Sequence, residues 1–235
     1  MKKIIIGVLA LVMSTSLFAK SWTSNVGVGF TVPITMVQGK DNIFYETLTS
    51  TTDKKTFTTY GLQGMYLGYH DNGFTFKGKL DLAFGMDKKT YYDSTDKEFK
   101  DILAINLNET LGVGYSFIRS EKVLLAATAG IGLSQIIIPY KTGVKISGTS
   151  YDQETTITYS TFNLGADLTA ILRTSQKFGF YASFYIGWIP FGNVKTENKI
   201  ERTTGGTTNS STTTDTKDLK GNIFIAPTIG LVWTF

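Results

Sequence analysis

Apolar residues alternate with polar or small residues along most of the chain. In residues 74–86 the even positions are apolar apart from Gly78, and the odd positions carry Lys77, Lys79 and Asp81. A two-residue period predicts a strand whose two faces meet different surroundings. The same period recurs in residues 24–38, 102–117, 123–138, 160–173, 178–189 and 223–235. Residues 57–70 are rich in β-forming residues, so the sequence predicts an all-β fold of eight strands.

The connections between these strands are of two kinds. Three are short (70–73, 118–122 and 174–177), and they alternate strictly with four long ones (39–56, 87–101, 139–157 and 190–221). Short turns at one end, long loops at the other and an even strand count are typical of an antiparallel up-and-down transmembrane β-barrel. A further hairpin inside the third or fourth loop would raise the count to ten.

The lengths of the apolar runs agree with a membrane-spanning barrel. A strand tilted by about 40° climbs about 2.5 Å per residue, so an apolar band of about 25 Å needs about ten residues. The runs 74–84, 162–172, 178–188 and 225–235 have this length. A soluble β-sandwich or lipocalin would show the same period with its apolar face turned inward.

Both ends of the chain favour the membrane barrel. Met1-Lys2-Lys3, an apolar run over 4–13 and small residues up to Ala19 predict a signal peptide over 1–19, which leaves 20–235 as the barrel domain. The last strand alternates up to a terminal Phe235. This strand resembles the C-terminal strand of bacterial outer-membrane β-barrels, and the whole layout resembles the small eight-stranded OmpX, OmpW and OmpA-barrel types. The resemblance implies that the barrel assembly machinery recognises the strand ending at Phe235.

Aromatic residues gather where girdles at the two membrane surfaces are expected. Trp188 is assigned to the outer girdle. The rim near the short turns receives Trp22, Phe74, Phe76, Tyr115, Phe117, Phe178, Phe180, Trp233 and Phe235.

The polar face of the strands predicts the content of the lumen, which in an eight-stranded barrel has room only for side chains. We expect a polar network of Lys77, Lys79, Asp81, Asp167 and Arg173. Such buried charges must pair, so a structural plug is favoured over an ion path. Glycines on the same face leave room for large lumen neighbours such as Tyr181 and Tyr185. The alternative is an open cavity in the periplasmic half, the half next to the short turns, and such a cavity would suit small apolar molecules.

Composition argues against several other functions. The chain of 235 residues has no cysteine, one histidine and a net charge of +4. No thiolate metal site or cysteine nucleophile is available, and the charge lacks the strong basic excess of a nucleic-acid binder. His70 falls in a turn with Asp71 and Asn72, where it is an ordinary turn residue. We therefore expect no catalytic residue, cofactor, metal ion or nucleic-acid partner.

Three residues and one loop fit the pattern poorly. Glu109 alternates in step with the residues of its strand that are predicted to face lipid. A position near the outer head groups would make its charge tolerable. Pro33 and Pro227 interrupt the first and last strands, where bulges at the closing seam would accommodate them. The tract 203–214 is almost entirely Thr, Ser, Gly and Asn and predicts a mobile loop. The third loop is expected to extend its two strands into a protruding ribbon.

These observations lead to a functional expectation. The sequence predicts a monomeric outer-membrane barrel with a structural or surface-interaction role, in contact with membrane lipid and able to bind an extracellular ligand through its long loops. The alternative is a porin-like or OmpW-like conduit for ions or small apolar molecules.

Overall fold

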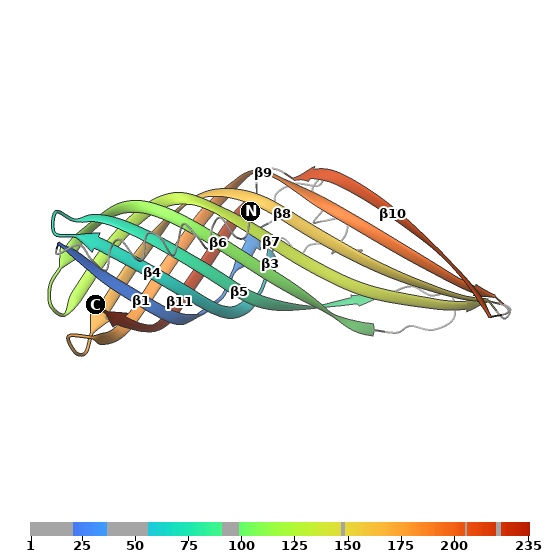
Figure 1. The fold of residues 1–235 in the computed structure, drawn as a ribbon, viewed down its shortest axis with the longest axis horizontal. Coiled ribbons are helices and arrows are strands. Elements are labelled where there is room, and N and C mark those ends of the chain that lie inside the picture. The colour runs from blue at the N-terminus through green and yellow to red at the C-terminus, as the bar shows by residue number, and fades with distance from the viewer. Residues whose placement is uncertain (1–20, 37–55, 91–98, 147–148, 205, 220–221) are drawn as a thin grey trace.

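The strands form one antiparallel sheet that closes on itself (Figure 1). The computed structural model describes residues 21–36, 56–90, 99–146, 149–204, 206–219 and 222–235. The predicted signal peptide and most of the first long loop lie outside these residues. The strands are β1 (Trp22–Thr31), β2 (Ile34–Met36), β3 (Thr56–Thr58), β4 (Tyr60–His70), β5 (Phe74–Thr90), β6 (Phe99–Arg119), β7 (Val123–Ile146), β8 (Thr149–Arg173), β9 (Phe178–Thr204), β10 (Thr207–Leu219) and β11 (Asn222–Thr234).

These segments make a ring of eight strands, because three of the eight are each divided in two. β10 and β11 pair with consecutive stretches of β9 in one register, with Leu219 opposite Gly192 and Asn222 opposite Ile189. β1 and β2 likewise follow one register against β11 and against the β3–β4 pair. The predicted eight-stranded, up-and-down, all-β fold is confirmed.

The prolines at the closing seam are accommodated without a bulge there. Thr31 lies opposite Thr228 and Ile34 lies opposite Ile225, so the register is the same on both sides of Pro33. The backbone nitrogen of Val32 still donates to the carbonyl of Pro227 at 3.0 Å. Because proline has no N–H to donate, the ladder loses bonds at this point while its residue pairing is kept.

Bulges occur elsewhere in the ring. On β9, Ile189 and Pro190 together face the single residue Asn163 of β8, since Trp188 pairs with Leu164 and Phe191 with Phe162. A second irregularity lies between Ser116 and Ile118 on β6. Proline is tolerated at a bulge because a ladder bond is missing there already. The bulge on β9 reverses which residues face outward beyond it, and Phe191 and Val194 take their orientations from this reversal.

The strands extend far beyond the boundaries predicted from the sequence. β7, β8 and β9 contain 24, 25 and 27 residues, a rise of about 60 Å or more against an apolar band of about 25 Å. The pairing of β6 with β7 ends at Ile105 and Ile137, whereas β7 to β10 continue as a narrow sheet (Figure 1). We call this part of the sheet, which consists of residues 138–146 of β7, 149–157 of β8, 195–204 of β9 and 207–219 of β10, the ribbon. The predicted protrusion of the third loop is confirmed, and the hairpins extend existing strands instead of adding a ninth and tenth.

The prediction of a mobile Thr-rich loop is wrong. Thr207–Leu219 is strand β10, and each of its residues has a partner on β9. Composition predicted disorder because the tract cannot bury apolar surface. The tract instead pairs along the exposed edge of β9 through backbone hydrogen bonds. Threonine favours this arrangement because β-branched residues are good strand formers.

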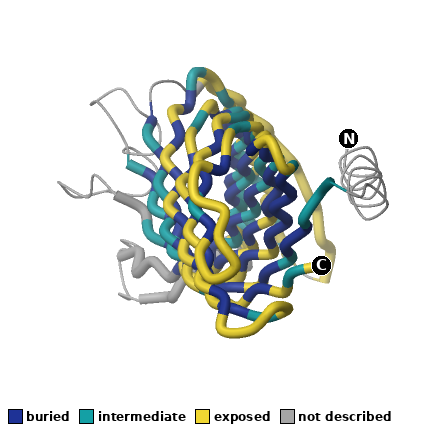
Figure 2. The backbone as a smooth tube through the Cα atoms, turned by 90° about the vertical axis from the view of Figure 1, so that its left-hand side faces the viewer, coloured by how far each residue is buried: buried dark blue, intermediate teal, exposed yellow. Residues whose placement is uncertain are grey.

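Buried and exposed positions alternate along the strands where they form the ring, whereas residues 207–218 of β10 are exposed throughout (Figure 2). Large apolar side chains on the outer face are about half exposed, among them Phe84, Leu168, Phe184 and Trp188. The polar residues Lys79, Asp81 and Asn108 face the lumen and are buried. An inverted arrangement, apolar outside and polar inside, is what a membrane-spanning barrel requires. In the part of the chain that the structure describes, no helix is long and apolar enough to cross a membrane.

Three tight turns lie at one end of the barrel, close to the C-terminus (Figure 1). We call this the turn end. In the first turn Gly73 has φ of 96° and donates to the carbonyl of His70 at 2.8 Å. This left-handed conformation favours glycine. His70 Nδ1 accepts from the backbone nitrogen of Asn72 at 3.2 Å, a structural role within the turn.

Candidate functional site: the polar lumen

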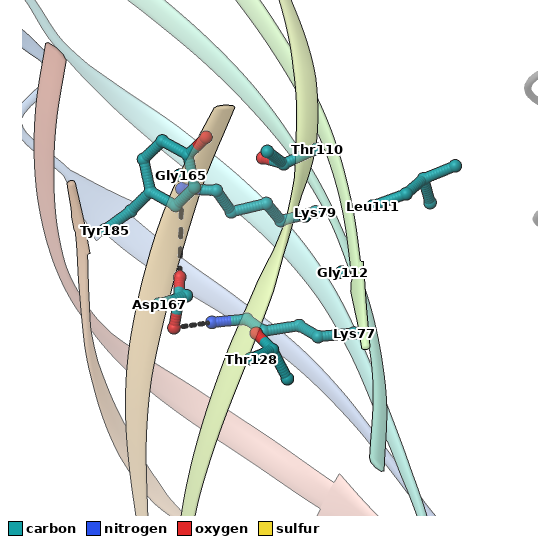
Figure 3. Close-up of a pocket in the computed structure, with 10 residues that line it drawn as sticks. Lys77, Lys79, Thr110, Leu111, Gly112, Thr128, Gly165, Asp167 and Tyr185 are labelled. Carbon is teal, nitrogen blue, oxygen red and sulfur yellow. Dashed lines mark hydrogen bonds and ion pairs between the residues drawn. The ribbon is translucent and has the colours of Figure 1, made fainter. Parts of the chain in front are cut away.

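Two lysines and two aspartates meet in the middle of the lumen, and Figure 3 shows Lys77, Lys79 and Asp167 of this group. Lys77, Lys79 and Asp81 project inward from β5, and Asp167 projects inward from β8. Lys77 Nζ donates to Asp167 Oδ1 at 2.6 Å and to Thr169 Oγ1 at 2.7 Å. β6 and β7 separate β5 from β8 around the ring, so this ion pair reaches across the lumen.

Lys79 occupies the centre of the cluster. Its Nζ lies 3.8 Å from Asp81 Oδ2 and 4.0 Å from Asp167 Oδ2, and it stands 4.0 Å from the centroid of the Tyr185 ring. All four charged side chains are at most 5% exposed. Their formal charges cancel, and a cation over an aromatic face gains further electrostatic stabilisation. The cluster therefore carries no net charge that would favour one sign of ion.

Neutral polar residues complete the hydrogen bonds of Asp81. Its Oδ1 accepts from Gln63 Nε2 at 2.7 Å, and its Oδ2 accepts from Asn108 Nδ2 at 3.2 Å. Gln63 also donates to Thr228 Oγ1 at 3.0 Å and accepts from the Tyr181 hydroxyl at 3.4 Å. These bonds tie β4, β5, β6, β9 and β11 together, and a buried carboxylate needs such partners.

The two lumen tyrosines pack directly on glycine backbone. A Cβ atom added to Gly29 or Gly230 would lie 2.5 Å from atoms of Tyr181, and one added to Gly165 would collide with the hydroxyl of Tyr185. The glycines of the lumen face thus make the room for the tyrosines that the sequence predicted.

Arg173 lies apart from the lysine–aspartate cluster, at the turn end. Its guanidinium donates to the carbonyl of Ser120 at 2.9 Å, to Thr234 Oγ1 and Tyr69 hydroxyl at 3.3 Å, and to Asn25 Oδ1 at 3.4 Å. These contacts join the first and last strands to the middle of the ring. Arg173 therefore closes the turn end and does not take part in the central pairing.

Apolar layers lie on both sides of the central cluster. The layer at the turn end consists of Met65, Leu67, Tyr69, Leu124, Ala126, Ile171, Tyr181 and Val232. The layer toward the ribbon contains Tyr185, Ile189, Phe224 and Ala226, with Ile136, Ile138, Ile157, Tyr159 and Val194 also buried on the lumen side. The turn-end half, where an open cavity was the alternative, is filled by side chains.

The space left beside the charged cluster is very small. A cavity of about 10 Å³ is lined by Lys77, Lys79, Asp167 and Tyr185 together with residues of β6 and β7 (Figure 3). This volume corresponds to about one water-sized sphere. It cannot hold an organic solute.

Aromatic side chains of the predicted girdle cluster on the outer face at the turn end. Trp22 packs edge-on against Phe74 with ring centroids 6.1 Å apart, and Phe178 packs against Trp233 at 5.7 Å. Tyr115, Phe117, Phe180, Trp188 and Phe235 are each at least half exposed on the outside, and Phe76 packs 6.4 Å from Tyr66. Trp188 lies on β9 toward the ribbon, away from this cluster.

The barrel is similar to several solved structures of outer-membrane proteins. OprG from Pseudomonas aeruginosa, an outer-membrane protein, is 10% identical over 92% of this chain and 97% of that chain, with a TM-score of 0.52. A major outer membrane protein from Thermus thermophilus is 12% identical over 88% and 99%, also with a TM-score of 0.52. This chain has the fold of the small outer-membrane β-barrels. No family model and no curated sequence matches it.

Other structural neighbours are similar to the barrel at a lower level. Ail, the attachment invasion locus protein of Yersinia pestis, is 12% identical over 92% of this chain and 99% of its own, with a TM-score of 0.46. At such identities the likeness concerns the path of the backbone alone. The roles of individual side chains in this barrel must come from its own geometry.

The sequence predicted charged residues in the lumen but not the apolar layers around them. Ile136 and Ile138 share the parity of Thr128 and Ser134 on β7, which is the lumen side. A change from polar to apolar residues within one parity was therefore the available signal. It falls in a stretch where both parities are apolar, so the period alone could not separate the faces.

Proposed function

We propose that this chain is an outer-membrane barrel that anchors the ribbon at the cell surface and has a lumen closed to solutes. The observation that carries the proposal is the stacking of a neutral charged cluster between two apolar layers. The apolar layers exclude water, and the two positive and two negative charges of the cluster cancel, so no net charge is left to attract an ion. A conduit would have to displace the Lys77–Asp167 pair, whose two partners are held on opposite sides of the lumen.

The outer face supports a position in the membrane. Its large apolar residues are exposed all around the ring, and in water so much apolar surface would drive association. Lipid is the surrounding in which this surface is stable. Export by residues 1–19, assembly through the strand that ends at Phe235 and a monomeric state belong to the same proposal.

The ribbon is the surface that this barrel would offer to an extracellular partner. Residues 207–218 of β10 are exposed throughout, and hydroxyl side chains predominate among them. On β9, Lys195 pairs with Glu197 at 2.9 Å and Lys199 pairs with Glu201 at 2.6 Å. The hydrogen bond to Glu201 raises the pKa of Lys199. Exposed pairs of this kind stabilise little, so the surface is hydrophilic and nearly neutral, as an exposed binding face would be.

Planar-bilayer conductance of the refolded protein tests the closed lumen. Insertion is first verified by the difference in gel mobility between unheated and boiled samples. The wild-type barrel is expected to show no regular conductance steps, and a Lys79→Ala variant leaves the apolar layers in place and is expected to remain silent too. Regular steps from the wild type, altered in size by Lys79→Ala, would establish a conduit and overturn the closed-lumen proposal.

Surface labelling tests the orientation of the ribbon. The chain has no cysteine, so a single introduced cysteine reports on one position. A membrane-impermeant maleimide added to intact cells is expected to label Thr212→Cys on the ribbon and to leave Ser175→Cys, in a turn at the other end, unlabelled. Equal labelling of both, or labelling of Ser175→Cys alone, would contradict the proposed orientation.

A further inference from the structure

A groove of about 570 Å³ runs across the outer face of β6 to β9 and reaches the start of the ribbon. Two adjacent rows of outward-facing residues border it. One row is Glu109, Leu133, Phe162 and Phe191, and the next is Leu107, Gln135, Ser160, Asn193 and Asp218; neighbours in each row are paired in the sheet. We call this the outer groove. Its volume is in the range of pockets that hold small molecules.

The two rows differ in chemistry. Leu133, Phe162 and Phe191 give the first row an apolar surface, and the two rings stack with centroids 4.8 Å apart. The second row presents the amides of Gln135 and Asn193 and the hydroxyl of Ser160, and it ends at the carboxylate of Asp218. The outer groove is thus apolar along one side and able to form hydrogen bonds along the other.

The position of the groove along the barrel can be derived from the register. Glu109 lies opposite Leu80 of β5, near the middle of the outward apolar run of that strand, whereas Phe191 lies beyond Trp188 at the ribbon end of the run on β9. Neighbouring strands are about 4.8 Å apart and tilted by about 40°, so such a row climbs about 3 Å with each strand. The polar row therefore reaches the outer edge of the apolar band, where lipid head groups begin.

Glu109 itself lies deeper than the sequence suggested. Leu107, Ile105 and Leu103 follow it on the outer face of β6, in the direction of the ribbon. The side chain is half-buried, and among the described residues nothing donates a hydrogen bond or forms an ion pair to it. Its carboxylate borders the membrane-side end of the groove, where the low dielectric strengthens repulsion of any further negative charge.

We propose that the outer groove binds a phospholipid whose head group joins a phosphate to a primary ammonium, as phosphatidylethanolamine does. The inference rests on the proposed position in the membrane. The described lining residues include two carboxylates and no lysine or arginine, which favours a cationic group and disfavours a lipid of net negative charge. Since lipid is the solvent of this face, the occupant is a lipid of the surrounding bilayer.

The order of groups along the polar row fits this head group. The amide of Asn193 and the hydroxyl of Ser160 can donate to phosphate oxygens, and Asp218, paired with Asn193 on the next strand, can accept from the ammonium. One strand spacing, about 4.8 Å, is within reach of the two-carbon link between the phosphate and the ammonium. The acyl chains then lie along Leu133, Phe162 and Phe191.

A second groove provides an internal control. It has about 580 Å³ on the outer face of β8, β9, β11 and β1, and it is lined by Phe30, Ala170, Leu172, Ala182, Ile229 and others without a charged residue. Acyl chains can occupy it, but it offers nothing that distinguishes one head group from another. Of these two grooves, the outer groove is therefore the one expected to select between head groups.

Native mass spectrometry of the full-length barrel, reconstituted in nanodiscs and released into detergent, tests the proposal. The nanodiscs contain equal amounts of phosphatidylethanolamine and phosphatidylglycerol with identical acyl chains. We expect the barrel to retain phosphatidylethanolamine at least about threefold over phosphatidylglycerol, and Asp218→Asn to reduce this ratio to about one half or less, as loss of one interfacial charge contact would. Asp215→Asn is the matched control, since Asp215 is exposed on the same strand but faces the other side, paired with Thr196.

A variant that fills the outer groove tests the proposal without relying on Asp218 alone. Ser160→Trp occupies the outer groove and is expected to abolish the preference, whereas Ala182→Trp fills the control groove and is expected to leave the ratio unchanged. Equal retention of the two lipids by the wild type, or the same ratio for Asp218→Asn and Asp215→Asn, would overturn the proposal. The gel-mobility shift measured on the same samples reports insertion, so a failure of the membrane position is distinguished from a failure of lipid selectivity.

Discussion

Replacing Asp167 by asparagine removes one charge from the centre of the lumen and little else. Asparagine has nearly the same shape, and its carbonyl oxygen can still accept from Lys77 Nζ, which lies 2.6 Å from the carboxylate. The change leaves Lys77 and Lys79 with Asp81 as their single negative partner. All three remaining charged side chains are at most 5% exposed, so water does not compensate for the missing charge.

The expected cost follows from this burial. Removing one partner of a buried ion pair typically destabilises a protein by about 3–5 kcal/mol, because the other charge stays buried without compensation. Lys77→Met is expected to destabilise the barrel by a similar amount, because it leaves the cluster with one excess negative charge. The double variant Lys77→Met/Asp167→Asn restores equal charges in the pair that remains, Lys79 with Asp81, and is expected to cost about 1 kcal/mol or less relative to the wild type.

Urea unfolding of the barrel from lipid vesicles, followed by fluorescence of its three tryptophans and by gel mobility, measures these free energies. The informative quantity is the coupling between the two single variants. A coupling below about 1 kcal/mol, with Asp167→Asn as stable as the wild type, would refute the reasoning, since it would mean that water reaches the cluster in the folded barrel.

Three further substitutions, one of them with a control variant, test other parts of the structure. Gly29→Ala places a Cβ atom 2.5 Å from the Tyr181 hydroxyl, and a loss of about 1–3 kcal/mol in the same assay is expected from overpacking; an unchanged stability would mean that the tyrosine lies elsewhere. Leu168→Arg on the lipid face should cost about 2–4 kcal/mol, whereas Thr212→Arg on the ribbon should cost nothing measurable, and equal effects would contradict the membrane boundary. Arg173→Met leaves several acceptors at the turn end without their donor and should lower stability by about 2–3 kcal/mol, seen as a lower midpoint of urea unfolding; a midpoint equal to the wild type would show that those hydrogen bonds add nothing.

The sequence predicted the ring of eight strands because each strand has two chemically distinct faces. Residues 74–86 illustrate the reason: lipid on one side and a packed polar lumen on the other impose opposite requirements on neighbouring positions. The same signal fails where both faces are polar. In residues 195–204 of β9 and 207–217 of β10 both faces of each strand meet water. The two-residue period therefore disappears, and the ladder between β9 and β10 could not be recognised.

The lumen could be predicted in its residues but not in its contacts. Lys77, Lys79, Asp81 and Asp167 were identified by parity, which is a local property. The separation of Arg173 from them depends on how far apart two strands place their residues along the barrel axis, and this offset is set by the register around the whole ring. The outer groove could not be predicted from the sequence either, because it depends on the bulge at Pro190, which turns Phe191 to the outside.

Site-directed spin labelling of the barrel in lipid vesicles tests the central claim most directly. Single cysteines replace outward residues of β8, such as Leu164, Leu168 and Leu172, and small lumen residues, Thr128 and Ser183. The account predicts that labels on β8 collide with dissolved oxygen, which concentrates in lipid, and that lumen labels collide neither with oxygen nor with a water-soluble nickel complex. Frequent collisions of the nickel complex with labels at Thr128 and Ser183 would reveal a water-filled lumen and contradict the closed barrel.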